Sequence, residues 1–317
     1  MKTWEAYTWE DNILELLVYG IVLGSIISLG AIGLSLIYGI LNFANFAHGE
    51  FMAGGAYITF FLISGPLAWI GVPDTTFGSL SFGWRLLISF PISMAAVGGL
   101  AIFIDRALYR KLRRKGAGRV MLAMSALGAS FIIRMIILII WGPDFLFYRP
   151  GVLRPALMLP FGIKIRPDQL VILVAVMVLV FALHLFLQRT KLGKAMRATA
   201  DNMDLALISG INIERIIVIT WIIGGGLAAA AGILYAVDVQ LHPALGWNFL
   251  LPLFAATILG SIGNIYGAFV GGLIIGIIQQ LSTAIILPTY KPAVAFLIMI
   301  IILLIKPQGI FGKRGRL

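Results

Sequence analysis

Long apolar segments follow one another along almost the whole of this 317-residue chain. A helix needs about 20 apolar residues to cross a bilayer, and most of these segments reach that length. The connections between them are short and polar, which is typical of a polytopic helical membrane protein. We therefore predict an all-α fold, a bundle of about eight or nine transmembrane helices. The predicted spans are 13–40, 50–68, 85–105, 120–141, 169–188, 215–237, 249–264, 267–287 and 292–305.

Composition leaves no room for a separate soluble domain. Hydrophobic residues make up 60% of the chain and charged residues only 12%, whereas soluble domains carry about 25% charge. We therefore predict one transmembrane domain over residues 1–317. The chain has no cysteine, and its three histidines, at positions 48, 184 and 242, share no ligand spacing. We predict no metal site and no cofactor.

The basic residues predict how the chain is oriented in the membrane. The formal net charge is +11, but the positive charges gather in short segments between apolar runs. Such segments face the cytoplasm, so this charge does not indicate nucleic-acid binding. With nine spans, the C-terminus then lies in the cytoplasm and the N-terminus outside. The clusters are residues 105–119 and 189–197, and Lys306, Lys313, Arg314 and Arg316 in the tail. The outward loop 142–168 carries Arg149, Arg154, Lys164 and Arg166, against the rule.

Polar residues interrupt the apolar pattern between positions 37 and 57. Asn42, Asn45, His48 and Glu50 stand there among several glycines. A lipid-facing helix would not carry them, whereas a broken helix that lines a protein cavity could. We therefore predict a broken helix here that lines a substrate path. Two alternatives stay open: the polar groups hydrogen-bond neighbouring helices, or Glu50 is a solvated cap at the cytoplasmic interface.

A second glycine-rich region with polar interruptions runs from residue 224 to 272. Asp238 and Gln240 lie within it. Paired interrupted segments in the two halves of a chain favour a path at the membrane midplane. We therefore predict that Asp238 and Gln240 also line the path.

Residues 189–214 are too polar to cross the membrane, yet they are patterned. Met196, Leu205 and Ile208 recur among charges, which predicts a short amphipathic helix. Gly210 is a helix stop, and Asn212 is a cap for the next helix. The segment is either a simple basic loop or a docking element for a cytoplasmic partner.

Four stretches carry a resemblance to a known family. Residues 45–50 read NFAHGE, a box of the inner-membrane permeases of branched-chain amino-acid ABC importers (LivH type). Residues 190–198 resemble the family's T-x-x-G-x-x-x-R-A loop, and residues 307–312 resemble its P-x-G-[IL]-[FL]-G ending. Residues 204–210 resemble the E-A-A-x-x-x-G coupling motif, with Asp204 in place of Glu and Leu205 in place of the first Ala. The resemblance covers essentially the whole chain.

The resemblance implies a multi-pass permease subunit in the bacterial inner membrane that forms half of a substrate path. Its expected partners are a second homologous permease, two cytoplasmic ATP-binding subunits, a periplasmic binding protein and the surrounding lipid. The sequence has no G-x-x-x-x-G-K-[ST] loop, so ATP is expected to bind to the partners, and the chain itself is expected not to be an enzyme. The residues expected to couple to the ATPases are Arg197, Asp204, Leu205, Ala206 and Gly210.

Two other functions stay open. Related permeases serve urea and short amides, so such a substrate is the first alternative. The second is a standalone ion-coupled transporter, which needs acidic residues at membrane depth; Glu50 and Asp238 are the candidates. A membrane-embedded enzyme would need a convergent set of catalytic groups, which the scattered histidines do not provide.

Overall fold

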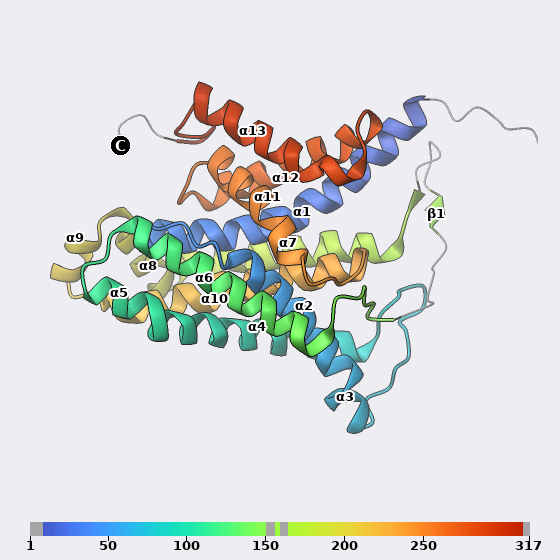
Figure 1. The fold of residues 1–317 in the computed structure, drawn as a ribbon, viewed down its shortest axis with the longest axis horizontal. Coiled ribbons are helices and arrows are strands. Elements are labelled where there is room, and N and C mark those ends of the chain that lie inside the picture. Colours follow the sequence, from blue (N-terminus) through green and yellow to red (C-terminus); the bar gives the residue numbers. More distant parts are fainter. Residues whose placement is uncertain (1–8, 150–155, 159–163, 313–317) are drawn as a thin grey trace, which may run out of the picture.

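The computed structural model describes residues 9–149, 156–158 and 164–312 of the chain. The predicted tail residues Lys313, Arg314 and Arg316, and Arg154, lie outside these residues. The described residues form a bundle of helices (Figure 1). The longer helices are α1 (Trp9–Leu41), α2 (His48–Ser64), α4 (Trp84–Ile104), α6 (Arg119–Trp141), α7 (Pro167–Arg189), α10 (Ile213–Asp238), α11 (Leu245–Gly260), α12 (Ile265–Leu281) and α13 (Lys291–Ile305). The short elements are α3 (Pro66–Trp69), η1 (Asp105–Tyr109), α5 (Arg110–Arg114), α8 (Lys191–Asp201), α9 (Met203–Ile208), η3 (Ser282–Ala284), η4 (Pro288–Tyr290) and an antiparallel ribbon of β1 (Leu157–Met158) and β2 (Lys164–Ile165).

The predicted fold class is confirmed. In the described part of the chain, eight helices are long and apolar enough to cross a membrane, and α11 is a shorter apolar helix. These nine helices coincide with the nine predicted spans. The seventh predicted span, 249–264, is short as expected but begins earlier, at Leu245. The predicted broken helix is also present, because residues 42–47 between α1 and α2 are not helical.

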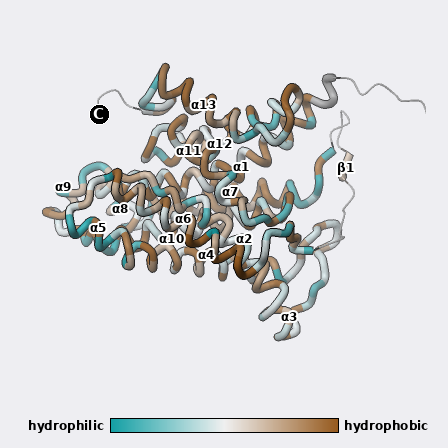
Figure 2. The backbone as a smooth tube through the Cα atoms, viewed as in Figure 1, coloured by the Kyte–Doolittle hydropathy of each residue, from teal (hydrophilic) through white to brown (hydrophobic). Residues whose placement is uncertain are grey.

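The basic segment 105–119, expected to be a loop, is largely helical. Helix α4 continues through the π-helical turn η1 into α5, up to Arg114. Arg113 donates two hydrogen bonds to the carboxylate of Asp105, at 2.7 and 3.2 Å, and this ion pair spans the π-helical turn. We call the end of the bundle that carries α5, α8 and α9 the basic end. Hydrophilic residues gather along α5 there (Figure 2).

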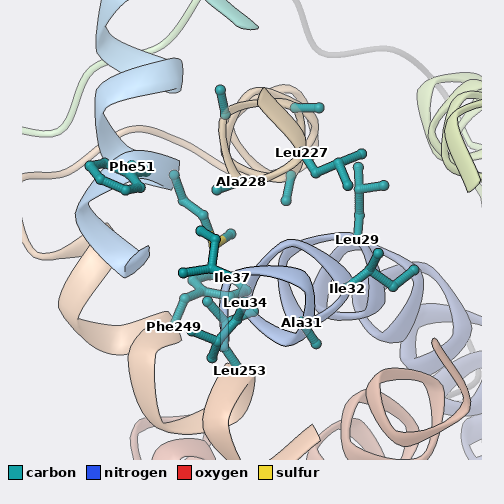
Figure 3. Close-up of a cluster of buried hydrophobic side chains, with 14 of the residues drawn as sticks. Leu29, Ala31, Ile32, Leu34, Ile37, Phe51, Leu227, Ala228, Phe249 and Leu253 are labelled. Carbon is teal, nitrogen blue, oxygen red and sulfur yellow. The ribbon is translucent and has the colours of Figure 1, made fainter. Parts of the chain in front are cut away.

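Helix α1 lies at the centre of the bundle. Its 33 residues are almost all apolar or small, and most of them are buried. Leu34 and Ile37 of α1 pack beside Phe51 of α2, Leu227 of α10 and Phe249 of α11 in one apolar cluster (Figure 3). Burial of this continuous apolar surface holds α2, α10 and α11 around α1.

Glycines let α1 and α10 approach each other closely. A Cβ atom on Gly33 would lie 2.7 Å from the carbonyl oxygen of Gly224, and one on Gly224 would lie 3.1 Å from that of Gly33. Small residues at such crossings are a common way for membrane helices to pack. The chain therefore needs both glycines at this crossing.

The two interrupted regions of the sequence meet inside the bundle. Helix α1 ends at the basic end and α10 begins there, so the two helices run in opposite directions (Figure 1). Each is followed by six non-helical residues, 42–47 and 239–244, and then by a short helix, α2 or α11. The first turns of α2 and α11 touch, because a Cβ on Gly49 would lie 2.2 Å from the Gly246 oxygen and one on Gly246 would lie 2.6 Å from the Gly49 oxygen. The two halves thus form an inverted pair of helix breaks.

Candidate functional site

The first break, residues 42–47, is held by its own polar groups. The side-chain Oδ1 of Asn45 accepts a hydrogen bond from the amide of Ala47 at 3.2 Å, and one from the hydroxyl of Tyr109 at 3.4 Å. The Tyr109 ring stacks on Trp221 of α10 at 5.5 Å. Asn45 is fully buried, and its Nδ2 has no partner among the described residues. Asn45 therefore shapes the break and joins it to η1.

His48 fixes the depth of α2. Its Nε2 donates to the carbonyl oxygen of Gly30 at 2.9 Å, because a carbonyl only accepts. Gly30 lies eleven residues before the end of α1, about 16 Å along that helix. The side chain is fully buried, and Nδ1 has no partner in the described part of the protein. The NFAHGE box therefore turns back into the bundle and does not stay at the basic end.

Glu50 is a buried carboxylate in the first turn of α2. The residue is 1% exposed, and its Oε2 has no hydrogen-bond partner among the described residues. This oxygen lies against Gly246 of α11, only 2.8 Å from where a Cβ would stand. Glu50 is thus not a solvated cap, and the helix N-terminus is the favourable end for its negative charge.

Arg134 of α6 was not singled out in the sequence, yet it interacts electrostatically with Glu50. Its guanidinium carbon lies 5.3 Å from the centre of the Trp247 ring, in a cation–π contact. An arginine at the middle of a membrane helix costs about 2.5–3.5 kcal/mol on insertion scales, and by default it indicates a functional site. Arg134 is the one charged residue between positions 120 and 141. That signal alone could have found it.

His242 lies in the second break, and Arg134 acts on it as well. Burial, with a smaller contribution from the charge of Arg134, lowers the pKa of His242 below its ordinary value. The imidazole is therefore neutral at pH 7. The edge of the Phe145 ring packs against it, with ring centres 5.9 Å apart. The second break is thus half-open, whereas Asn45 and Ala47 of the first break are fully buried.

A cleft of about 710 Å³ opens at the end of the bundle opposite the basic end. Asp238 lies in its wall, where its Oδ1 accepts from Arg166 at 2.6 Å and from Gln169 at 3.0 Å. Lys291 donates to Gln280 at 2.7 Å on another wall. The other polar residues of the wall are Tyr19, Tyr235, Asn248, Gln279 and Thr289. The cleft wall therefore carries both acidic and basic side chains, and most of these form hydrogen bonds or ion pairs with one another.

A smaller cleft of about 170 Å³ shares Asp238 and Arg166 with the larger one. Its polar groups mainly hold the loop before α4. Arg149 pairs with Asp74 at 2.8 Å, and the carboxylate of Asp168 accepts from the amide of Ser81 at 2.8 Å. This cleft therefore serves to dock the loop onto α7.

The structure does not bring all six expected path residues together. Asn45, His48 and Glu50 lie in or beside the first break, and Asp238 lies in the cleft wall. Gln240 is half-buried in the second break and does not line the large cleft. Asn42 is exposed at the end of α1 with a φ of 54°, and its amide donates to the carbonyl of Tyr38 at 2.8 Å. Asn42 thus ends α1 in a left-handed conformation, which asparagine tolerates well.

The segment 189–214 contains the predicted short amphipathic helix as α8, and a second short helix, α9, follows it. Asn202 interrupts them and caps α9, with its Oδ1 accepting from the amide of Leu205 at 2.9 Å. The predicted stop and cap are both present: Gly210 has a φ of 83°, and Asn212 caps α10. The side chains of Asn202 and Asn212 accept from backbone amides in the first turn of the next helix, which is why α9 and α10 begin where they do.

Helix α9 presents an apolar face to the outside. Leu205, Leu207 and Ile208 are 57%, 60% and 81% exposed, whereas Ala206 is buried. Arg197 and Asp204 are exposed as well. Of the three apolar residues that recur in the sequence pattern of this segment, Met196 is buried, whereas Leu205 and Ile208 are exposed. The apolar residues of α9 are therefore free to meet another molecule.

Comparison with known proteins identifies the family. A family model described as the permease component of branched-chain amino acid transport systems matches residues 16–303. The high-affinity branched-chain amino acid transport system permease protein BraD of Pseudomonas aeruginosa is 33% identical over 309 residues, covering 95% of this chain and 96% of that protein. The corresponding permease protein LivH of Escherichia coli K12 is 33% identical over 314 residues, with the same shares covered.

A more distant relative also matches along most of its length. The probable branched-chain amino acid transport permease protein LivH of Methanocaldococcus jannaschii is 30% identical over 307 residues, covering 92% of this chain and 90% of that protein. No solved structure matches the chain. With eight long apolar helices in its described part and these relatives along nearly its whole length, the chain belongs to the permease family of branched-chain amino acid transport systems, whose members are multi-pass inner-membrane proteins.

Proposed function

We propose that this permease is a subunit of an ATP-binding-cassette importer for branched-chain or other neutral amino acids. It would work with a second homologous permease, two cytoplasmic ATP-binding subunits and a periplasmic binding protein. The names of its relatives support the substrate class. The sequence has no phosphate-binding loop of its own, so a partner has to supply the energy.

The exposed apolar face of α9 is the observation that carries the coupling to ATPases. Leu205, Leu207 and Ile208 lie at the basic end, outside the apolar spans, where lipid does not cover them. An exposed apolar cluster rimmed by charges is typical of a protein interface. Arg197, Asp204 and Gly210 flank this face, and Ala206 anchors it from beneath. ATP-driven closure of the partners would push on α9 and, through α10, on the core.

The proposed route for the substrate enters at the large cleft and passes the contact between α2 and α11. Asp238 and Gln240 would lie along its outer part, and Asn45, His48 and Glu50 beside its centre. A free amino acid carries both charges, and the cleft wall offers Asp238, Arg166 and Lys291. Asn42 is not part of the proposed route.

The test is reconstitution of the whole complex in liposomes, with radiolabelled L-leucine, ATP and the binding protein. The wild-type complex should take up leucine only with ATP. Asp204→Arg and Gly210→Glu should uncouple ATP hydrolysis from uptake, and uptake should fall at least tenfold. Gly116→Glu is the matched control, because Gly116 also has a positive φ in open space but lies outside α9 and the loop that follows it.

Normal, coupled uptake in the Asp204 and Gly210 variants would show that α9 is not the docking element. The importer assignment would be refuted if the chain purifies without any ATPase and takes up leucine when an ion gradient is applied. In that case Glu50 becomes the first candidate for an ion-coupling residue.

The proposed orientation has a direct test, because the chain has no cysteine of its own. Ser79 lies in the exposed loop before α4, and Ser209 follows α9 at the basic end. A membrane-impermeant maleimide should label Ser79→Cys in intact cells and Ser209→Cys only after permeabilisation. The reverse result would invert the topology.

A further inference from the structure

Arg134 is a charged side chain in the middle of the apolar helix α6. Among the described residues it forms no hydrogen bond and no salt bridge within 4.0 Å, and its contact is the Trp247 ring. Its neighbours Phe131 and Met135 are 44% and 45% exposed. About 10 Å of helix separates Arg134 from the end of α6 at Trp141, so it lies within the depth of the membrane. A lipid tail cannot satisfy a guanidinium group at this depth.

Glu50 is the complementary group. Its Oε2 is buried and unpartnered, although the charge of Arg134 acts on it. Glu50 and Arg134 form no salt bridge within 4.0 Å, so neither side chain satisfies the other directly. A buried carboxylate without a partner is unfavourable unless something else binds it.

Trp247 connects these two groups. The residue before it, Gly246, lies against Oε2 of Glu50, and the indole ring of Trp247 makes the cation–π contact with Arg134. Phe131 stacks on the Trp247 ring, with centres 5.8 Å apart and planes at 30°. The Trp247 side chain is 40% exposed, so this aromatic wall is open on one side.

We propose that Glu50, Arg134 and Trp247 form a subsite for one zwitterionic α-amino acid during its passage. The ammonium group of the substrate binds the Glu50 carboxylate, and its carboxylate binds the Arg134 guanidinium. The apolar side chain lies on Trp247 and Phe131. This subsite rests on the proposed function and sharpens it, because urea and simple amides carry neither charge and would leave both groups unpaired.

The experiment uses the reconstituted complex and measures two rates, uptake of radiolabelled L-leucine and ATP hydrolysis. Glu50→Gln and Arg134→Gln should each lower uptake per ATP at least tenfold. Hydrolysis stimulated by leucine-loaded binding protein should stay within twofold of wild type. Arg134→Lys, which keeps the charge, should recover part of the uptake. The control is Arg110→Gln, which removes a cation that pairs with Glu214 at the surface and should change neither rate more than twofold.

Unchanged uptake per ATP in both glutamine variants would overturn the subsite and leave the importer assignment intact. Loss of the second permease from Arg134→Gln would overturn it too, because Arg134 would then pair with that partner. If the complex with Glu50→Gln does not assemble, Trp247→Leu is the deciding variant, because it keeps both charges. Its uptake of leucine per ATP should fall several-fold. Unchanged uptake per ATP in this variant would contradict the subsite. A wild-type complex without ATP-dependent leucine uptake would instead refute the proposed function.

Discussion

The two helix breaks of this permease have the same backbone plan and different chemistry. In both breaks, an alanine precedes the first residue of the following helix. The backbone amide of that first residue donates a hydrogen bond to the carbonyl three positions earlier. His48 donates to Asn45 at 3.2 Å, and Leu245 donates to His242 at 2.9 Å. In the first break Asn45 and Ala47 are fully buried and Asn42 at its start is exposed, whereas the second break is half-open and leads into α11, whose Asn248 lines the large cleft. The difference suggests a division of labour, in which the first break is a fixed pivot and the second borders the route.

The largest effect should come from the contact that joins the two breaks. Gly49→Val would place side-chain atoms inside the backbone of Gly246, because even a Cβ would lie 2.2 Å from its oxygen. We expect a loss of about 3 kcal/mol of stability, measured as recovery of monodisperse complex and its melting temperature. The control is Gly99→Val on α4, where nothing lies within 4 Å of the added Cβ. Equal recovery of the two variants would mean that the breaks do not touch.

The next effect tests the first break as a pivot. His48→Ala removes the hydrogen bond to Gly30 in a dry site, which should cost about 2 kcal/mol. The complex should still assemble, and leucine uptake should fall several-fold because α2 is no longer held at its depth. His184→Ala, which removes a partly exposed contact to Tyr266, is the control and should behave like wild type. Unchanged uptake in His48→Ala would leave His48 as packing only.

A smaller effect on stability is expected on the open side. Asp238→Asn removes the negative charge that pairs with Arg166, but this pair is partly exposed and should contribute about 1 kcal/mol or less. Uptake should fall several-fold, with ATP hydrolysis unchanged, if the cleft is the entrance. Asp74→Asn breaks the comparable Asp74–Arg149 pair away from the large cleft and should leave uptake intact. Equal losses in the two variants would remove Asp238 from the route.

The smallest effect is expected at Asn42. Gly tolerates the left-handed backbone of this exposed residue at least as well, so Asn42→Gly should change stability by about 0.5 kcal/mol or less. Uptake should equal that of wild type. A clear loss of uptake, measured beside the His48 variant, would restore Asn42 to the substrate path.

Local chemistry in the sequence predicted the elements well. Apolar length located the nine helices, and the clustered polar residues predicted the break at 42–47. Gly210 and Asn212 act on their own backbone, so their roles as stop and cap could be predicted from position alone. The family's box marked Glu50 without indicating that it is buried.

Contacts across the chain could not be predicted in this way. Gly49 and Gly246 lie almost 200 positions apart, and no local pattern says that their helices touch. Arg134 gave a signal as a lone charge in an apolar span, but its partner Trp247 became visible only in the fold. The amphipathic pattern did not say where its apolar residues point, and the outward position of Leu205 became visible only in the fold.

The central claim is that the first helix break is closed to solvent and the second is open to it. Its most direct test compares two alanines at equivalent positions in the two breaks. Ala47 is fully buried and Ala244 is half-buried at the equivalent position. Single-cysteine variants are made in this cysteine-free chain, reconstituted as the full complex and treated with a membrane-impermeant maleimide, with Asn248→Cys in the cleft wall as the positive control. We predict that Ala244→Cys is labelled from outside and that Ala47→Cys is not labelled from either side. Equal labelling of the two cysteines, or faster labelling of Ala47→Cys, would contradict the account.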